Sequence, residues 1–250
     1  MHSSETIERA CADAWPALVE DKIGDWRLRA ADGFTGRANS ALAVGDPGVA
    51  VPEALRLVCE FAHRNHIPPV VQVLSGSGTE REIQAAGWVP NTGHAAGHLV
   101  SVLLGRPGEA DSPGVTVLDE PTPGWWELTA GTATPTAAER HVLTTGEIGY
   151  GVAVVDGVTA GVVRAAIAAD LLHISRLAVH PDFRRRGLAT LLMNAAGTWG
   201  RSRGATACVL QVAVDNGSAL ALYAGLGFTE HHRYRYWVPA PTDACEDPTL

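Results

Sequence analysis

No stretch of this 250-residue sequence is apolar for long enough to cross a lipid bilayer. The first residues also lack the basic and apolar regions of a secretory signal peptide. Cysteine is scarce, and the four cysteines form no close pair, which predicts reduced thiols. They are Cys11, Cys59, Cys208 and Cys245. Together these absences predict a cytoplasmic protein without membrane association.

Positive charge is also in short supply, because 19 Lys and Arg stand against 27 Asp and Glu, for a net charge of −8. Such a chain cannot neutralise many phosphates, which argues against nonspecific nucleic-acid binding, whereas its negative field attracts cationic amines. Apolar residues make up 46% of the chain, enough for a packed core without metal or disulfide support. The length suits one large domain or two small ones.

One basic segment goes against this acidic background. A strand predicted at 171–179 leads through a proline into Arg184-Arg185-Arg186-Gly187-Leu188-Ala189, and a helix is predicted at 190–203. Backbone N–H groups at the start of a helix, beside three arginines, suit a pyrophosphate. The alternative is a solvated turn with exposed arginines, since a single glycine turn is weak evidence. The Gly-x-Ala spacing and the helix that follows favour the anion site.

A strand predicted at 207–214 leads into a second block. With the basic turn, this block resembles the GCN5-related N-acetyltransferase family. The turn matches the family's Arg/Gln-x-x-Gly-x-Gly/Ala loop, and the second block matches its Asn-x-x-Ala-x-x-Leu-Tyr-x-x-x-Gly-Phe motif. The matching positions of this motif are Asn216, Ala219, Leu222, Tyr223, Gly227 and Phe228. The resemblance is specific over about residues 145–238, weaker over 115–145, and only architectural before that.

A stretch rich in proline and glycine, at about 105–124, divides the chain. We predict an N-terminal domain at 1–105, a linker and start of the second domain at 106–124, a catalytic domain at 115–239, and a loose tail at 240–250. Within the second domain, the pattern predicts helices at 125–130, 137–143 and 218–225, and strands at 115–118, 149–155 and 158–168. Asp156-Gly157 joins the last two as a hairpin, and a final strand pair is predicted at 228–238.

The first half contains a degenerate repeat of this order of elements. Strands are predicted at 26–31, 37–45 and 70–74, and helices at 52–65 and 80–86; Ala86-Gly87-Trp88 sits where Leu226-Gly227-Phe228 sits in the second half. Gly45-Asp46-Pro47-Gly48 replaces the basic turn, and an aspartate there would repel a pyrophosphate. The resemblance implies an α/β fold with mixed sheets and two tandem domains, of the actinobacterial type in which one domain is catalytic and the other degenerate. We predict no second coenzyme in the first domain.

The resemblance further implies acetyl-CoA as co-substrate and names the residues that would hold it. The pyrophosphate falls to the loop residues Arg184, Arg185, Arg186, Gly187, Leu188 and Ala189, and to Thr190 after them. The pantetheine arm would pair with the backbone of Leu177, Ala178 and Val179, with an N–H near Val179 polarising the carbonyl. Asn216 would hydrogen-bond the pantetheine amide, and Ser218 would cap the helix that carries Tyr223.

Tyr223 is the candidate general acid, because a phenol can protonate a departing thiolate; the alternative is a tyrosine packed in the core. The family's glutamate base is missing from the strand before the loop. His173 has suitable acid–base chemistry, and Ser175 could position a water. Glu127 and Glu147 are alternatives, as is an amine that arrives already neutral.

Histidines and a cysteine at helical spacing raise the question of a metal, but no fourth ligand is readable, so none is predicted. They are His94 and His98, and Cys59, His63 and His66. The predicted function is direct acetyl transfer to a primary amine of a small molecule, such as an amino acid, amino sugar or antibiotic-like amine. Acetylation of protein N-termini or lysines, or a non-catalytic acyl-CoA-binding role, are the alternatives. We expect a monomer or homodimer.

Overall fold

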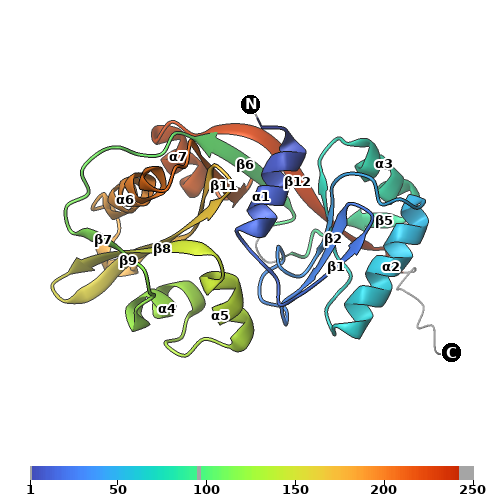
Figure 1. Ribbon diagram of the computed structural model, residues 1–250, viewed down its shortest axis with the longest axis horizontal. Helices are drawn as coiled ribbons and strands as arrows, with labels where there is room; N and C mark the ends of the chain where they lie inside the picture. The colour runs from blue at the N-terminus through green and yellow to red at the C-terminus, as the bar shows by residue number, and fades with distance from the viewer. Residues whose placement is uncertain (1, 95–96, 242–250) are drawn as a thin grey trace. The chain divides into compact units, whose positions relative to one another are not determined.

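The computed structural model describes residues 2–94 and 97–241, which form two compact units (Figure 1). Unit 1 takes its residues from Met1–Val102, Val212–Asn216 and His231–Leu250, and unit 2 from Leu103–Gln211 and Gly217–Glu230. The units are therefore not two continuous halves of the chain. Two late segments belong with the N-terminal part, whereas composition points only to a division near residue 105.

Unit 2 is built on a mixed sheet with strand order β11-β10-β9-β8-β7, in which only β10 and β11 run parallel. Figure 1 shows α4 and α5 on one face and α6 on the other. The elements are β7 (Val115–Leu118), α4 (Pro123–Ala130), α5 (Ala137–Thr144), β8 (Glu147–Val155), β9 (Val158–Ala168), β10 (Leu171–Val179), the 3-10 turn η1 (Pro181–Phe183), α6 (Leu188–Ser202), β11 (Ala207–Ala213) and α7 (Gly217–Gly225). Strand β12 (Thr229–Pro239) follows, and from His231 onward it belongs to unit 1.

Local sequence signals account for the ends of these elements. Asp156 and Gly157 both have positive φ (51° and 78°), which is the backbone that a two-residue hairpin requires, so the predicted β8–β9 hairpin is confirmed. Helix α5 begins with a capping box, in which Thr136 and Glu139 each accept the other's backbone N–H. The predicted final strand pair is wrong, because 229–239 form one long strand, β12.

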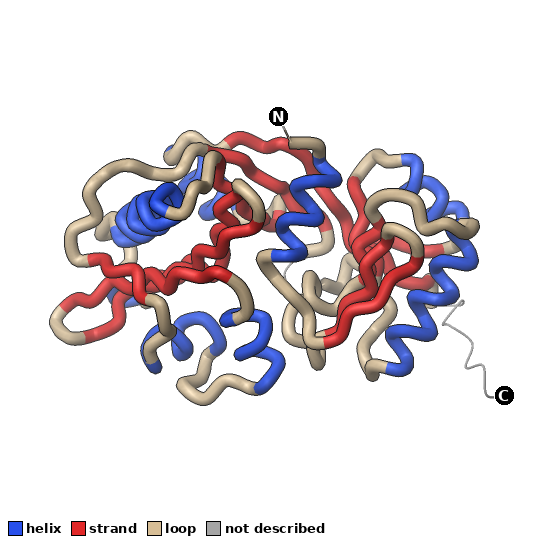
Figure 2. The backbone as a smooth tube through the Cα atoms, viewed as in Figure 1, coloured by secondary structure: helices blue, strands red, loops and turns tan. Residues whose placement is uncertain are grey.

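Unit 1 repeats the plan, with strand order β1-β2-β3-β4-β12 and β5 also paired to β12. Its sheet is also mixed, because β3 and β4 run parallel. The tube in Figure 2 shows helices on both faces of these strands. The elements are α1 (Ser4–Asp13), β1 (Val19–Ile23), β2 (Trp26–Ala30), β3 (Ala41–Ala43), α2 (Val51–Arg64), β4 (Val71–Leu74), α3 (Gly78–Ala85), β5 (Trp88–Pro90) and β6 (Leu99–Gly105), whose last residues belong to unit 2.

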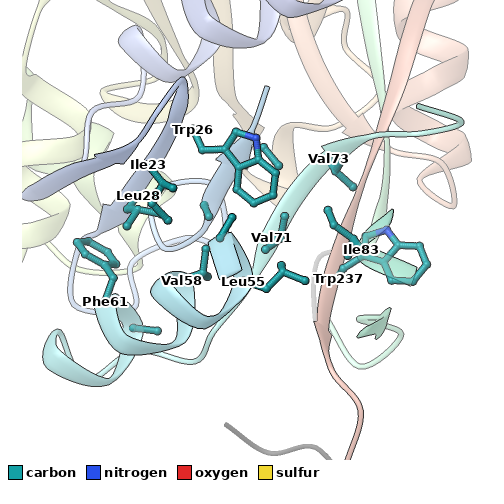
Figure 3. Packing of buried hydrophobic residues seen from close by; sticks show 14 of the residues in the cluster. Ile23, Trp26, Leu28, Leu55, Val58, Phe61, Val71, Val73, Ile83 and Trp237 are labelled. Atoms are coloured by element: carbon teal, nitrogen blue, oxygen red, sulfur yellow. The ribbon is translucent and has the colours of Figure 1, made fainter. Parts of the chain in front are cut away.

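The core of unit 1 lies between its sheet and α2 (Figure 3). The predicted apolar stripe of α2, which includes Leu55, Val58 and Phe61, is buried there against Trp26 and Val71. Each such side chain contributes roughly 1.5–3 kcal/mol when it leaves water. This packing fixes the helix against the strands and confirms the helix predicted at 52–65.

The strand predicted at 37–45 is reduced to the three residues of β3. Asn39 is the reason, because its side chain organises the preceding segment as a loop. Its Oδ1 accepts from the N–H of Ala31 and of Gly33, and its Nδ2 donates to the carbonyls of Phe34 and Thr35. A side chain that satisfies four backbone groups replaces the strand ladder.

The cysteines differ in their redox state. Cys11 and Cys208 are free and buried. Cys59 is disulfide-bonded, so the prediction of reduced thiols is wrong there, and Cys245 lies outside the described residues.

None of the helices within 2–94 and 97–241 has the length and apolarity needed to cross a bilayer. Over the same residues no group of three or more His, Cys, Asp or Glu side chains is arranged to hold a metal ion.

Candidate functional site

The basic turn of unit 2 leads directly into α6. Gly187 is the residue before the helix and has a φ of 77°, and Arg185 also has a positive φ of 62°. No side chain in the described part of the chain caps this helix. The N–H groups of its first turn, from Leu188, Ala189 and Thr190, are therefore left for an anion.

Backbone carbonyls orient two arginines of the turn. Arg184 donates from Nε to the carbonyl of Val179 at 3.3 Å, and Arg186 donates from Nη2 to the carbonyl of Asp182 at 3.2 Å. Arg186 also lies over the ring of Phe183, at 5.2 Å from its centroid. Backbone carbonyls orient a guanidinium without neutralising it, so the turn presents positive charge beside the uncapped helix end.

Strand β10 parts from β11 just before this turn. Their register runs from Leu171 opposite Ala207 to Ile174 opposite Leu210, although β10 continues to Val179. On the other edge, β10 pairs with β9 but shifts register between Ser175 and Ala178. Arg176, inside this bulge, has a φ of 52°. A bulge re-aims a strand, so the stretch of Leu177, Ala178 and Val179 offers its β11-side edge to an extended ligand.

Tyr223 lies on α7, and its motif neighbours explain its position. Gly227 has a φ of 81°, and the N–H of Phe228 donates to the carbonyl of Tyr223, which closes the helix. The buried Phe228 ring lies 5.9 Å from the Tyr223 ring. Burial raises the pKa of Tyr223 above its ordinary value. The phenol therefore keeps its proton at neutral pH, as a general acid must.

His173 and Ser175 lie on β10 and are 0% and 8% exposed. Ser175 is opposite Arg164 of β9, and opposed residues of antiparallel strands share a face. Arg164 donates to the carbonyls of Val142 and Leu143 in α5, so Ser175 and His173 face the α4–α5 side.

The alternative bases and the remaining coenzyme residues lie elsewhere. Glu127 of α4 is exposed, and Glu147 is exposed and ion-paired with Arg203 at 3.2 Å. Asn216 belongs to the segment Val212–Asn216 of unit 1, where its N–H donates to the carbonyl of Ala213. Ser218 lies in the first turn of α7, one residue after the helix begins at Gly217.

The model of the family described as "Probable histone acetyltransferase Rv0428c C-terminal" matches residues 4–237 of this chain. The chain belongs to this family. The resemblance to GCN5-related N-acetyltransferases is thereby confirmed, together with the predicted fold class.

Solved structures share the fold over nearly the whole chain. A GCN5-related N-acetyltransferase from Kribbella flavida is 16% identical, with 95% of each chain covered and a TM-score of 0.71. A tandem GNAT protein from the clavulanic acid biosynthesis pathway is 17% identical, with 93% of this chain and 86% of that one covered and a TM-score of 0.59.

Curated relatives match only a part of the chain. N-alpha-acetyltransferase 30 of Schizosaccharomyces pombe is 40% identical over 73 residues, which is 29% of this chain and 48% of that protein. The chain spans from 30% to 56% of the lengths of the curated relatives it matches.

Three features of this site escaped the sequence analysis: the bulge at Arg176, the buried Arg164, and Tyr150 opposite it on β8. Burial raises the pKa of Tyr150 to about 12, and its hydroxyl donates to the Leu143 carbonyl at 3.3 Å. A signal was present, because Arg164 interrupts the apolar run Val162-Val163-Arg164-Ala165-Ala166. A charge inside such a strand indicates a buried, hydrogen-bonded group.

Proposed function

We propose that this chain is an acetyl-CoA-dependent N-acetyltransferase, in which unit 2 binds the co-substrate and the acetyl group passes directly to a primary amine. One observation carries the proposal: the uncapped, arginine-flanked start of α6 directly follows the parted stretch of β10. The first suits a pyrophosphate, and the second suits an extended pantetheine arm. The thioester carbonyl would then meet the N–H near Val179.

Tyr223 supplies the proton in this proposal. Amine attack forms the nitrogen–carbon bond as the carbon–sulfur bond breaks, and the phenol protonates the leaving thiolate. Direct transfer is favoured over an acyl-enzyme on Cys208, because burial raises the pKa of that thiol to about 12. A thiol that stays protonated is a poor nucleophile.

The amine's proton needs an acceptor, for which we propose His173. It lies on the α4–α5 face, two residues before Ser175, whereas Glu127 and Glu147 are exposed and Glu147 is ion-paired. A neutral amine loses one proton on becoming an amide, and an ammonium ion loses two. A kcat that rises with pH in the unaltered chain and stays flat in His173→Gln would support this assignment, and identical profiles would contradict it.

The acceptor we favour is a small cationic amine, in keeping with the net charge of −8. A protein amine is the second candidate, because the matching family and the fission-yeast relative carry names of protein acetyltransferases. That relative matches only 73 residues. Thiol release with spermidine and glucosamine, compared with that for a peptide with a free N-terminus, would separate the two.

Calorimetric titration with acetyl-CoA tests the co-substrate site, using the variant Gly187→Glu. A side chain there is strained by the φ of 77° and brings a negative charge to the phosphate position. Gly204→Glu is the matched control, since Gly204 follows α6, has a φ of 86° and is equally open. We expect one site per chain, lost in Gly187→Glu and kept in Gly204→Glu. Absence of binding to the unaltered chain would overturn the proposed function.

A further inference from the structure

Two serines hold equivalent places in the two units. Ser40 precedes Leu42-Ala43-Val44 in unit 1, and Ser175 precedes Leu177-Ala178-Val179 in unit 2, with 135 positions between the counterparts (40 and 175, 42 and 177). The strand pairing is equivalent as well. In unit 1, Arg27 is opposite Leu42, and continuing this register by two residues places Arg29 opposite Ser40. In unit 2, Arg164 is opposite Ser175, and Arg164 lies 135 positions after Arg29.

In unit 1 the serine is fully engaged. Arg29, which is 2% exposed, donates from Nη2 to Ser40 Oγ at 3.1 Å and from Nε to the Ser40 carbonyl at 3.2 Å. The Ser40 hydroxyl itself lies 3.4 Å from the carbonyl of Arg37, to which it donates. This buried hydroxyl thus has both a donor and an acceptor, as a structural serine should.

In unit 2 the equivalent arginine, Arg164, hydrogen-bonds to a helix rather than to the serine. Arg164 is 0% exposed and donates to the last carbonyls of α5, from Nε to Leu143 at 3.0 Å and from Nη2 to Val142 at 3.3 Å. Ser175 is 8% exposed, and its Oγ has no hydrogen-bond partner among the described residues. A buried polar atom left in this state is rare and calls for an explanation.

The position of Ser175 supplies one. It follows Ile174, the last residue of β10 that pairs with β11, and comes immediately before the bulge at Arg176. We propose that the Ser175 hydroxyl binds the acceptor, by accepting a hydrogen bond from an N–H of its primary amine. This inference rests on the proposed acetyltransferase function, and it assigns to Ser175 a direct contact with the acceptor.

The chemistry requires such a group. A neutral amine attacks through its single lone pair, so its N–H bonds must be held away from the thioester carbon. A hydroxyl can accept one N–H and orient the lone pair. As the nitrogen–carbon bond forms and the carbon–sulfur bond breaks, the nitrogen gives its surplus proton to the base, and the sulfur takes one from Tyr223. Ser175 neither gains nor loses a proton overall.

The test compares Ser175→Ala with Ser40→Ala in the full chain. Ser175→Ala removes an unsatisfied hydroxyl, so we expect an unchanged or higher Tm, an unchanged acetyl-CoA Kd, and an acceptor KM raised about tenfold. Ser40→Ala removes one of the acceptors of the Arg29 guanidinium, so we expect a Tm lowered by roughly 2–4 °C and unchanged kinetics. Ser175→Cys fills nearly the same volume with a weak acceptor and should behave like Ser175→Ala, which excludes a cavity effect.

The probes are spermidine, glucosamine and a peptide with a free N-terminal alanine, with thiol release as readout. A Ser175→Ala variant that loses Tm as Ser40→Ala does, or that keeps the acceptor KM, would overturn the inference. Release no faster with any of these amines than without would overturn the amine assignment. Failure of the proposed function looks different, because the unaltered chain would then not bind acetyl-CoA, while the Tm comparison of the two serines would still stand.

Discussion

The loops that precede α2 in unit 1 and α6 in unit 2 start from the same plan and differ in their treatment of negative charge. In unit 1, Asp25 accepts the N–H of Asp46 at 3.0 Å, and Asp46 accepts the N–H of Gly48 at 2.8 Å. Two backbone donors of this loop are thus occupied by the chain's own carboxylates. In unit 2 the corresponding turn carries arginines instead, although neither α2 nor α6 has a side-chain cap among the described residues. The two loops therefore differ in the charge that surrounds their backbone donors.

The strands before these loops also differ, in how far they stay paired with the neighbouring strand. In unit 1, Leu42 pairs with Gln72 and Ala43 with Val73, so β3 and β4 stay together up to the loop. In unit 2, the equivalent Leu177 and Ala178 lie beyond the last β10–β11 pair and beyond the bulge at Arg176. Closed strands leave no edge for a pantetheine arm. Both differences support the proposal that unit 1 does not hold a second coenzyme.

The largest effect on kcat is expected at Tyr223 of α7, because the equivalent position in unit 1 carries no hydroxyl. Counting back from the matched Gly87 and Gly227, Tyr223 of α7 corresponds to the fully buried Ile83 of α3. Tyr223→Phe should lower kcat about 100-fold and leave the Kd for acetyl-CoA unchanged, because only proton donation is lost. Steady-state kinetics and calorimetry check this. Tyr150→Phe is the control, which should cost stability but not kcat; an equal loss in both variants would contradict the acid assignment.

The next effect is expected at the equivalent buried arginines. Arg29→Met and Arg164→Met should each lower the free energy of unfolding by about 2–3 kcal/mol, because buried acceptors lose a charged donor. Denaturant titration measures both. Only Arg164→Met should also raise the acceptor KM, since Arg164 holds the end of α5 on the face that carries Ser175. Unchanged kinetics in Arg164→Met would show that the two arginines are alike in function as well as in position.

A smaller effect is expected in the loop that supplies its own anion. Asp25→Ala should lower the free energy of unfolding by about 1 kcal/mol, because the N–H of Asp46 loses its acceptor. Acetyl-CoA stoichiometry should stay at one per chain, since the strands of unit 1 remain paired. A second binding event in this variant would show that the carboxylates alone had closed the site.

The smallest effect concerns pH. Burial raises the pKa of Tyr223 above its ordinary value of about 10, so the protonated acid persists to higher pH. The alkaline fall of kcat due to this group should therefore lie above pH 10 and vanish from the profile of Tyr223→Phe. A fall centred below pH 9 that disappears in the variant would contradict the raised pKa.

Much of unit 2 could be predicted because local signals determine it. Asp156-Gly157 specifies the β8–β9 hairpin, and the basic turn indicates where α6 begins. In unit 1, β1 escaped prediction because its residues, Val-Glu-Asp-Lys-Ile, bury only Ile23 and show no alternation. The bulge at Arg176 escaped too, because a non-glycine residue with positive φ is imposed by tertiary packing rather than by local preference.

The site was predictable in its residue types but not in its hydrogen bonding. The motif pointed to the turn and to Tyr223, and His173 and Ser175 followed from the strand before the turn. That Arg164 bonds to α5 and leaves Ser175 Oγ unsatisfied depends on contacts between segments more than 20 residues apart. No local pattern encodes such a choice of partner.

The place of β12 has a consequence for biosynthesis. Residues 234–237 of this strand pair with β4, so the sheet of unit 1 is finished by a segment synthesised about 160 residues after it. The N-terminal unit therefore leaves the ribosome first but must wait, with one edge of its sheet unpaired, until residue 239 has emerged. A stalled or truncated nascent chain would expose that edge, so the part of this protein that is synthesised first is the last to be completed.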